Sequence, residues 1–444
     1  MSLPSKLLYN NKINASYARN FNSVIQAQNT QNYGLGQTAI FNIPCMRNQV
    51  LSGADTMLSL RLRTRNGGTI NNGCLNKGGI ASAIQRLRIF SGSQLLCDID
   101  NYGTLISLLT PWQSSLEHVR GKLQLLQGTG YGRGLQIMTA IAANADNVDY
   151  DFAFPLLSIL SLTDNYVPLW AMASNGPLRV EVQFVDALTK FIGATTAITN
   201  HSDGVNTVFS DCKLIANFVE LSDSAMAIIE NSLEGKPVQW VCQSYANYVF
   251  STTLQNAVTQ VSIPIPAKYN SLKALYMVMR TSDASAGALA SYADNFLRFG
   301  MTQYTTRIGS RVIPAEPPNT IPQFVAEMER ALGSASSRIS PSSYTYDGVR
   351  TTGTVTPLQS IGTLAGEVIT LPIPTGSFAV GIETESYSSA PMGSVYQGLN
   401  TSTDDIFWQG TFAAQGAATV VRFDAYASYD QLITIDNGVV QVQY

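Results

Sequence analysis

The sequence predicts an all-β protein made of two tandem antiparallel β-domains, with a few short helices. Three observations predict this class. Apolar and polar residues alternate with a period of two in several segments, helical periodicity is rare, and the pattern of the first half recurs in the second. The chain has 444 residues, and a single hydrophobic core usually stops growing at roughly 250–300 residues, so two domains are the default expectation.

Strict alternation marks the expected strands. It is clearest in four stretches, 41–43, 58–62, 86–89 and 178–184. One face of each such strand is apolar and the other is polar, which is typical of antiparallel sheets that cover a core on one side only.

Short helices are expected in three places: over 222–233, over 321–332 and after Tyr102-Gly103. Ser222 is a favourable N-cap residue, and a glycine follows each of the first two segments closely enough to end the helix.

The second half repeats the first at an offset of 217 residues. At this offset the alternating triplet Leu58, Leu60 and Leu62 matches Leu275, Met277 and Met279, and the following Arg63 matches Arg280. Further along, Gly92-Ser93 matches Gly309-Ser310, and the apolar pair Leu95-Leu96 matches Val312-Ile313. Residues 41–44 match 261–264 at an offset of 220. A repeat of this length is too long for a solenoid or a propeller blade and predicts two copies of one domain.

The chain is expected to divide into three parts. These are an N-terminal arm over 1–36, a first domain over 37–235 that includes a connecting helix, and a second domain over 236–444. The arm is rich in Asn and Gln, and the first acidic residue of the chain is Asp55. Two long polar loops, 193–211 and 333–357, are expected to face solvent.

The composition limits the possible functions. Charged residues make up 13% of the chain, about half the usual quarter. Neutral polar surface costs less to desolvate than charged surface, which suits a protein that covers its exterior with copies of itself, although a Ser/Thr-rich extracellular protein would look similar. The net charge of −3 excludes a chain-wide basic surface for nucleic acid.

The five cysteines are widely spaced and form no C-x-x-C pair. We expect buried free thiols, which suit assembly in a reducing compartment. No secretory signal is visible.

The search for catalytic or binding motifs yields little. The only histidines are His118 and His201, both in polar surroundings, and the sequence has neither a P-loop nor a G-x-S-x-G elbow. The glycine-rich stretch 128–134 departs from the dinucleotide-binding pattern. The pairs Asp98/Asp100 and Asp404/Asp405 have ligands suited to a divalent cation, but turn and cap roles fit them better. We therefore expect no catalytic, cofactor-binding or metal-binding residues, no cofactor and no enzymatic activity.

Several stretches carry a resemblance. In the first half these are SAIQRLRIFSGSQLLCDIDNYGTL at 82–105, FPLLSILSLTDNYVPLW at 154–170 and GPLRVEVQF at 176–184, and in the second half they are TRIGSRVIPAEPP at 306–318, FAVGIETE at 378–385, GLNTSTDDI at 398–406 and VVRFDAYASYDQLITIDNGVVQV at 420–442. In this order along the chain, the sequence resembles the double jelly-roll major capsid proteins of the tectivirus–adenovirus lineage, which includes polinton-like viruses, adintoviruses and virophages. The resemblance implies two tandem eight-stranded jelly-roll barrels.

The resemblance also implies partners and a location. It implies a homotrimer whose six barrels form a pseudo-hexagonal capsomer, and trimer–trimer contacts that tile an icosahedral shell. Penton and minor capsid proteins are expected as further partners. The N-terminal arm is expected to contact neighbouring subunits, and an internal membrane or the genome are further possible contacts. The protein is expected in the virion, after assembly inside the host cell.

Two alternatives belong to other classes. A two-domain β-sandwich that binds a receptor or a carbohydrate would expose aromatic residues near loop tips, and Tyr344, Tyr346, Tyr387 and Tyr396 are candidates. A β-rich glycosidase would need two suitably spaced carboxylates, which the sequence alone does not exclude.

Overall fold

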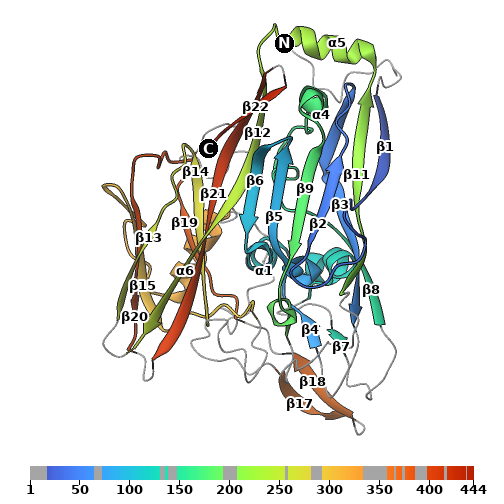
Figure 1. Cartoon of the computed structure of the whole chain (residues 1–444). Coiled ribbons are helices and arrows are strands. Elements are labelled where there is room, and N and C mark those ends of the chain that lie inside the picture. Colours follow the sequence, from blue (N-terminus) through green and yellow to red (C-terminus); the bar gives the residue numbers. More distant parts are fainter. Residues whose placement is uncertain are drawn as a thin grey trace, which may run out of the picture.

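Two β-barrels stand side by side in the computed structural model of the chain (Figure 1). The structure describes residues 18–64, 73–130, 136–138, 148–193, 208–255, 259–281, 293–333, 358–364, 367–372, 376–385, 398–414, 418–436 and 438–444. All strand pairings within its sheets are antiparallel, as the alternation predicts.

The first barrel is built from two four-stranded sheets, with the strand orders β1-β11-β3-β8 and β2-β9-β5-β6. A small sheet, β10-β4-β7, lies at one end. The bounds are β1 Ala18–Gln26, β2 Thr38–Ile43, β3 Gln49–Thr64, β4 Gly73–Leu75, β5 Ile84–Ser91, β6 Gln94–Asp100, β7 Gln136–Met138, β8 Val148–Pro155, β9 Leu178–Phe184, β10 Ile192–Gly193 and β11 Phe209–Leu221.

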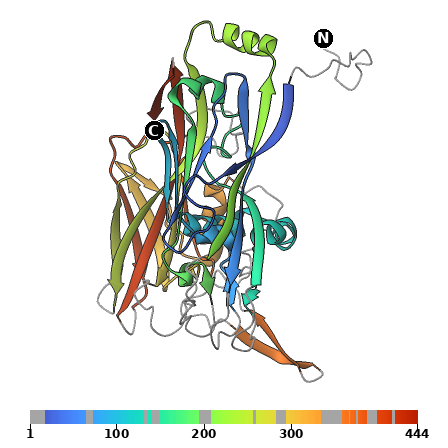
Figure 2. The same ribbon diagram turned by 45° about the vertical axis from the view of Figure 1, so that its right-hand side comes forward.

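The second barrel has the sheet orders β12-β21-β14-β19, with β22 added beside β21, and β13-β20-β15-β16. A separate hairpin, β17–β18, projects from one end of the molecule (Figure 2). The bounds are β12 Val238–Leu254, β13 Gln260–Ile265, β14 Leu272–Thr281, β15 Met301–Ile308, β16 Arg311–Ile313, β17 Leu358–Leu364, β18 Glu367–Pro372, β19 Val380–Glu383, β20 Ile406–Phe412, β21 Thr419–Asp436 and β22 Val439–Gln443.

The two barrels share one topology, which confirms the predicted repeat. The sheet β1-β11-β3-β8 of the first barrel matches β12-β21-β14-β19 of the second, and β2-β9-β5-β6 matches β13-β20-β15-β16. Thus β1 corresponds to β12, β3 to β14 and β6 to β16. The matched leucines Leu58 and Leu275 lie in β3 and β14. The matched glycines, Gly92 and Gly309, occupy equivalent hairpin turns with φ of 58° and 56°, a backbone conformation that glycine adopts without steric cost.

The core of each barrel lies between its two sheets. In β9 the alternate residues Leu178, Val180, Val182 and Phe184 are buried. Stacked aromatic rings join the sheets, with ring centroids 4.2 Å apart for Phe184 and Phe209 in the first barrel. Apolar burial on this scale is the main favourable contribution to folding.

The three expected helices are present as α1 (Tyr102–Gln113), α5 (Asp223–Ser232) and α6 (Ile321–Ala331). The Ser222 hydroxyl accepts a hydrogen bond from the Ala225 N–H and so caps α5 as predicted. Shorter helical segments are η2 Gly79–Ala83, α2 Leu116–His118, η3 Val119–Leu123, α3 Gln124–Gln127, α4 Leu169–Met172, η4 Ala173–Asn175 and η5 Leu188–Lys190. None of the described helices has the length and apolar character that crossing a bilayer requires.

The segment 1–36, expected as an arm, contains a strand of the barrel. In this segment β1 pairs with β11, from Ala18 opposite Leu221 to Gln26 opposite Lys213. Phe21 stacks on Phe218, with ring centroids 5.6 Å apart. The Asn/Gln-rich composition hid an alternation in which Phe21 and Ile25 face the sheet's inner side.

The three-part division at 1–36, 37–235 and 236–444 stays a prediction. The helix α5 lies between the last strand of the first barrel and the first strand of the second. Most of both predicted loops, 194–207 and 334–357, lies outside the described residues, as do residues 1–17.

Candidate functional site at the junction between the barrels

The residues considered for catalysis are not brought together. His118 is exposed in α2, and His201 lies outside the described residues. Asp98 forms an ion pair with Arg86, and Asp405 forms one with Lys268, so each carboxylate has a partner within the chain. Within the described residues, no group of three or more His, Cys, Asp or Glu side chains could hold a metal ion.

Four cysteines whose side chains are described carry free thiols, as predicted. Cys97, Cys212 and Cys242 are buried, and Cys45 is half-buried. Burial raises the pKa of Cys97 to about 11 and that of Cys212 to about 12. These thiols are therefore protonated at neutral pH and poorly nucleophilic.

Buried polar side chains gather where the second barrel meets the first. The edge strand β12 lies against the first barrel (Figure 1). The Gln243 N–H donates to the Leu162 carbonyl at 2.9 Å, and the Thr163 hydroxyl donates to the Val241 carbonyl at 2.9 Å. Next to it, Gln431 on β21 donates from Nε2 to the Leu96 carbonyl at 2.6 Å. Backbone groups of both barrels thus find partners across the junction.

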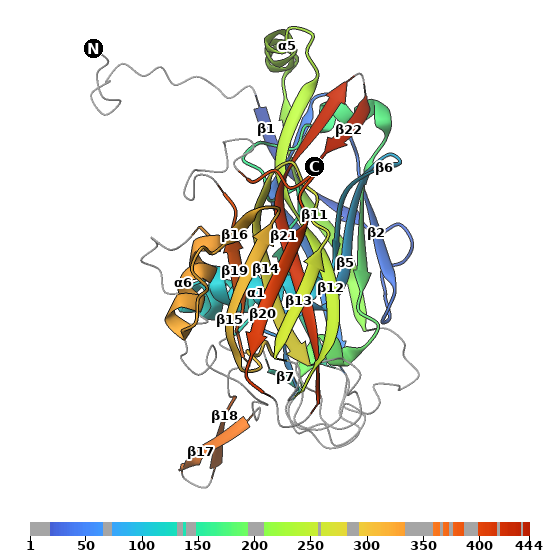
Figure 3. The same ribbon diagram turned by 90° about the vertical axis from the view of Figure 1, so that its left-hand side faces the viewer.

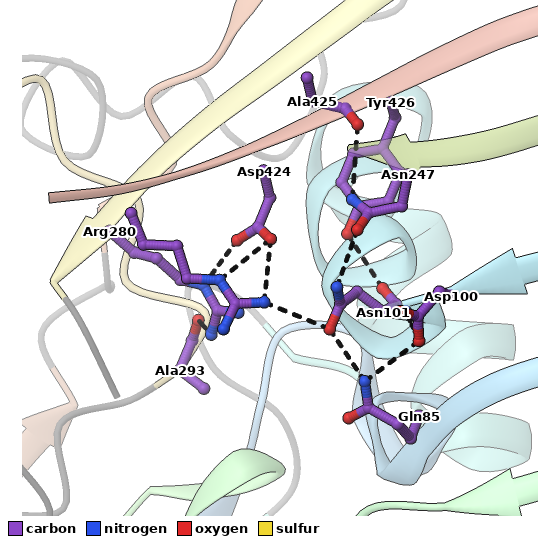
Figure 4. Close-up of polar contacts among 10 residues, drawn as sticks. Gln85, Asp100, Asn101, Asn247, Arg280, Ala293, Asp424, Ala425 and Tyr426 are labelled. Carbon is purple, nitrogen blue, oxygen red and sulfur yellow. Dashed lines mark hydrogen bonds and ion pairs between the residues drawn. The ribbon is translucent and has the colours of Figure 1, made fainter. Parts of the chain in front are cut away.

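Asn101 is the centre of a polar cluster at this junction (Figure 4). It stands at the N-terminus of α1 with φ of 47°, a left-handed conformation that Asn tolerates better than most residues. Its Nδ2 donates to Asn247 Oδ1 at 2.8 Å, and its carbonyl accepts from the Tyr426 hydroxyl at 3.0 Å. Gln85 of the first barrel donates to Asn101 Oδ1 at 2.9 Å, which fixes the side chain.

A buried ion-pair cluster continues from Asn101 into the second barrel. Arg280 Nε lies 2.8 Å from Asp424 Oδ2, and the two side chains are 7% and 0% exposed. Arg422 Nη2 lies 3.2 Å from the other carboxylate oxygen of Asp424, and it also reaches Asn101 Oδ1 at 3.4 Å. Buried charges persist only where they are paired and hydrogen-bonded. Asp424 therefore holds both arginines in place, and Arg422 reaches the first barrel at Asn101.

Lys77 is the second anchor of the junction. It follows β4 of the first barrel, and its Nζ donates to the Gly376 carbonyl at 2.6 Å and to the Ser377 hydroxyl at 3.2 Å. The ammonium also lies 4.7 Å from the centre of the Phe296 ring. Burial lowers the pKa of Lys77 to about 8, and the nearby Asp294 carboxylate opposes that shift. Trp112 of α1 donates from Nε1 to the Ser377 carbonyl at 3.1 Å.

The junction is suited to holding the barrels at a fixed angle. Hydrogen bonds and ion pairs are directional, and in a buried setting a lost partner is costly, so few relative orientations satisfy all of them. Sequence reasoning reached Arg280 only as the counterpart of Arg63. It missed Asn101, whose position before a helix was a usable signal, and Lys77, for which no local signal exists.

Comparison with known proteins gives a match in structure alone. Neither a protein-family model nor a curated protein sequence matches the chain. A quasi-atomic model of the PBCV-1 virus capsid is similar with a TM-score of 0.59 and 12% identity, covering 98% of this chain and 99% of that one. A cryo-EM structure of the Sputnik virophage gives 0.57 and 12%, covering 100% and 92%. The Faustovirus major capsid protein gives 0.57 and 8%, covering 97% and 92%.

The fold is a double jelly roll. The predicted fold class is confirmed, and the resemblance seen in the sequence holds at the level of fold. Since the similarity spans nearly the whole length of each protein, both jelly rolls and their side-by-side placement are shared. In this chain, Asn101, Arg422 and Lys77 make hydrogen bonds that join the two jelly rolls in that placement.

Proposed function

We propose that the chain is a major capsid protein that forms homotrimeric, pseudo-hexameric capsomers of an icosahedral virus shell, and that it is not an enzyme. The observation that carries the proposal is the pair of topologically equivalent barrels held side by side by a buried polar junction. Solved structures with this fold come from virus capsids, including the Faustovirus major capsid protein.

The geometry explains why doubling the barrel is useful. Three chains related by a closed three-fold axis place six similar barrels in a ring. Such a ring has a nearly hexagonal outline, and hexagonal tiles cover a shell using one kind of chain. The fixed angle between the barrels of a chain then sets the shape of the tile.

The surface composition suits repeated self-association. Only 13% of the residues are charged, so bringing two surfaces together removes few charges from water. Trimer–trimer contacts would tile the shell, and penton and minor capsid proteins would complete it. The N-terminal residues would contact neighbouring subunits, an internal membrane or the genome. The protein would reside in the virion after assembly inside the host cell.

Sedimentation velocity of the purified full chain tests the proposal. We expect a species with three times the 47.9 kDa chain mass that persists on dilution, because interfaces between permanent subunits are large. A single monomeric species at every concentration would contradict the proposal and would favour a receptor- or carbohydrate-binding protein instead.

A further inference from the structure

The internal repeat pairs each surface of the first barrel with an equivalent surface of the second. One member of such a pair is covered by the other barrel at the junction, and the other member is exposed among the residues that the structure describes. This difference suggests where a second copy of the chain could bind.

The covered strand is β12, the edge strand of its sheet. Val241, Gln243 and Asn247 of β12 all bond to the first barrel, and Tyr245 is only 3% exposed. The surface that receives β12 includes β6, where Leu96 is 1% exposed, and Asn101 at the start of α1.

The equivalent strand in the first barrel is β1, which is also the edge strand of its sheet. The strand register defines which residues correspond, starting from the matched leucines Leu58 and Leu275. In the first barrel, Leu58 of β3 lies opposite Leu214 of β11, which lies opposite Ile25 of β1. In the second barrel, Leu275 of β14 lies opposite Ala427 of β21, which lies opposite Ala246 of β12. Ile25 thus corresponds to Ala246, Val24 to Tyr245 and Gln26 to Asn247.

Exposure separates the two strands. Val24 is 54% exposed, whereas its counterpart Tyr245 is buried. The same side of β1 carries Asn20, Asn22 and Gln26, all exposed and uncharged. An exposed edge strand of this kind has one side that pairs with no other strand of its described sheet, and another chain can cover that side.

The receiving surface is duplicated as well. By the repeat, the half-buried Leu95 of β6 corresponds to Val312 of β16, which is 50% exposed, and the buried Leu96 corresponds to the half-buried Ile313. Thr320 precedes α6 as Asn101 precedes α1. Figure 3 shows β16 and α6 together on one side of the second barrel, with β12 on the other side. Figure 1 shows β1 on the side of the first barrel that faces away from the second.

We propose that β1 of one chain docks against β16 and residues 314–320 of a second copy, which reproduces between chains the contact of β12 with β6 and Asn101. The inference rests on the proposed function, because it specifies which surfaces meet in the trimer. The contact is head-to-tail, since different surfaces of the two copies meet, and a repeated head-to-tail contact closes into a ring when its rotation allows. In the proposed trimer the ring closes after three chains, which gives six equivalent junctions.

A charge placed on β1 tests the docking. Val24→Asp should raise the concentration needed for half-maximal trimer formation by about tenfold or more, because it buries an unpaired carboxylate at the contact. Ile228→Asp is the matched control, since Ile228 is 70% exposed on α5, outside the proposed contact. It should sediment as the wild type does, and circular dichroism verifies that both variants are folded.

Cross-linking tests the geometry without disturbing the contact. The double variant Gln26→Cys with Asn319→Cys, treated with a short bismaleimide, should give covalent dimers and trimers on a denaturing gel. Each single variant should give neither, which controls for the native thiols. Asn319 is used because the neighbouring Thr320 caps α6.

The outcomes separate the inference from the proposed function. If the wild type is a trimer but the double cysteine variant is not cross-linked, the docking of β1 is wrong and the capsid proposal stands. The same conclusion follows if a folded Val24→Asp variant forms trimers as the wild type does. A wild type that stays monomeric at all concentrations would overturn both.

Discussion

The junction depends on a few buried charged side chains. Lys77, in the first barrel, donates hydrogen bonds to Gly376 and Ser377. Asp424, in the second barrel, forms ion pairs with Arg280 and Arg422. Such buried interactions contribute little net stability compared with apolar packing, but removing one partner leaves an uncompensated charge. These residues therefore set the orientation of the barrels more than they set the total stability.

Lys77 should make stability depend on pH. Its pKa is about 8 in the folded chain against an ordinary 10.5, so between these values the unfolded chain binds more protons and stability rises with pH. The destabilising effect is fully present below about pH 8 and is lost towards pH 10.5. Between pH 7.5 and 9.5 the wild type should gain about 2 kcal/mol relative to Lys77→Met, measured by urea unfolding at both values. If the unfolding free energies of the wild type and Lys77→Met change equally between these two pH values, Lys77 does not titrate in this way.

Asp424 should be far more sensitive to substitution than an exposed acid. Asp424→Asn leaves Arg280 and Arg422 without their carboxylate and should cost about 3–5 kcal/mol of unfolding free energy. Asp151→Asn is the matched control, because its side chain is 70% exposed and pairs with Arg61 on the surface; it should cost less than about 1 kcal/mol. Equal losses in chemical denaturation would refute the assigned role of Asp424.

At the scale of elements, close backbone approach fixes α1 against the first barrel. A Cβ added at Gly103 would lie 2.3 Å from the Ser82 carbonyl oxygen. The N-terminal turn of α1, next to Asn101, therefore packs directly on η2. Any larger residue there must move α1 and with it the cluster around Asn101.

Gly103→Ala should accordingly destabilise the chain by about 1–3 kcal/mol. Gly121→Ala provides the comparison, since nothing lies within 4 Å of a Cβ added there. In a helical segment this change should be neutral or stabilising by up to about 1 kcal/mol. Thermal unfolding of the two variants distinguishes them, and a Gly103→Ala protein as stable as the wild type would argue against tight packing of α1.

Elements were predictable where the local pattern is strong. The alternation at 178–184 gave β9 with its bounds, and Ser222 marked the start of α5. The strand β1 escaped because Asn and Gln fill its outward side, so only Phe21, Ser23 and Ile25 on its inner side carry the signal. Its pairing with β11 spans nearly the whole first barrel in sequence, and local propensity does not encode such contacts.

At the scale of the whole molecule, the repeat was the informative feature. Weak matches such as Leu58 with Leu275 gained meaning because one offset served several places, and the shared strand order confirms it. The junction could not be predicted in the same way. Lys77 and Ser377 are 300 positions apart, and nothing in a single sequence shows that such residues meet.

The central claim is that two equivalent barrels per chain make a six-barrelled tile from three chains. Cryo-electron microscopy of the purified protein tests this most directly, by averaging projections along the particle axis. The account predicts a hexagonal ring of six similar densities with three-fold symmetry, in which the junctions within and between chains alternate. Particles that contain only two barrels, or three chains joined without a closed ring of six, would contradict it.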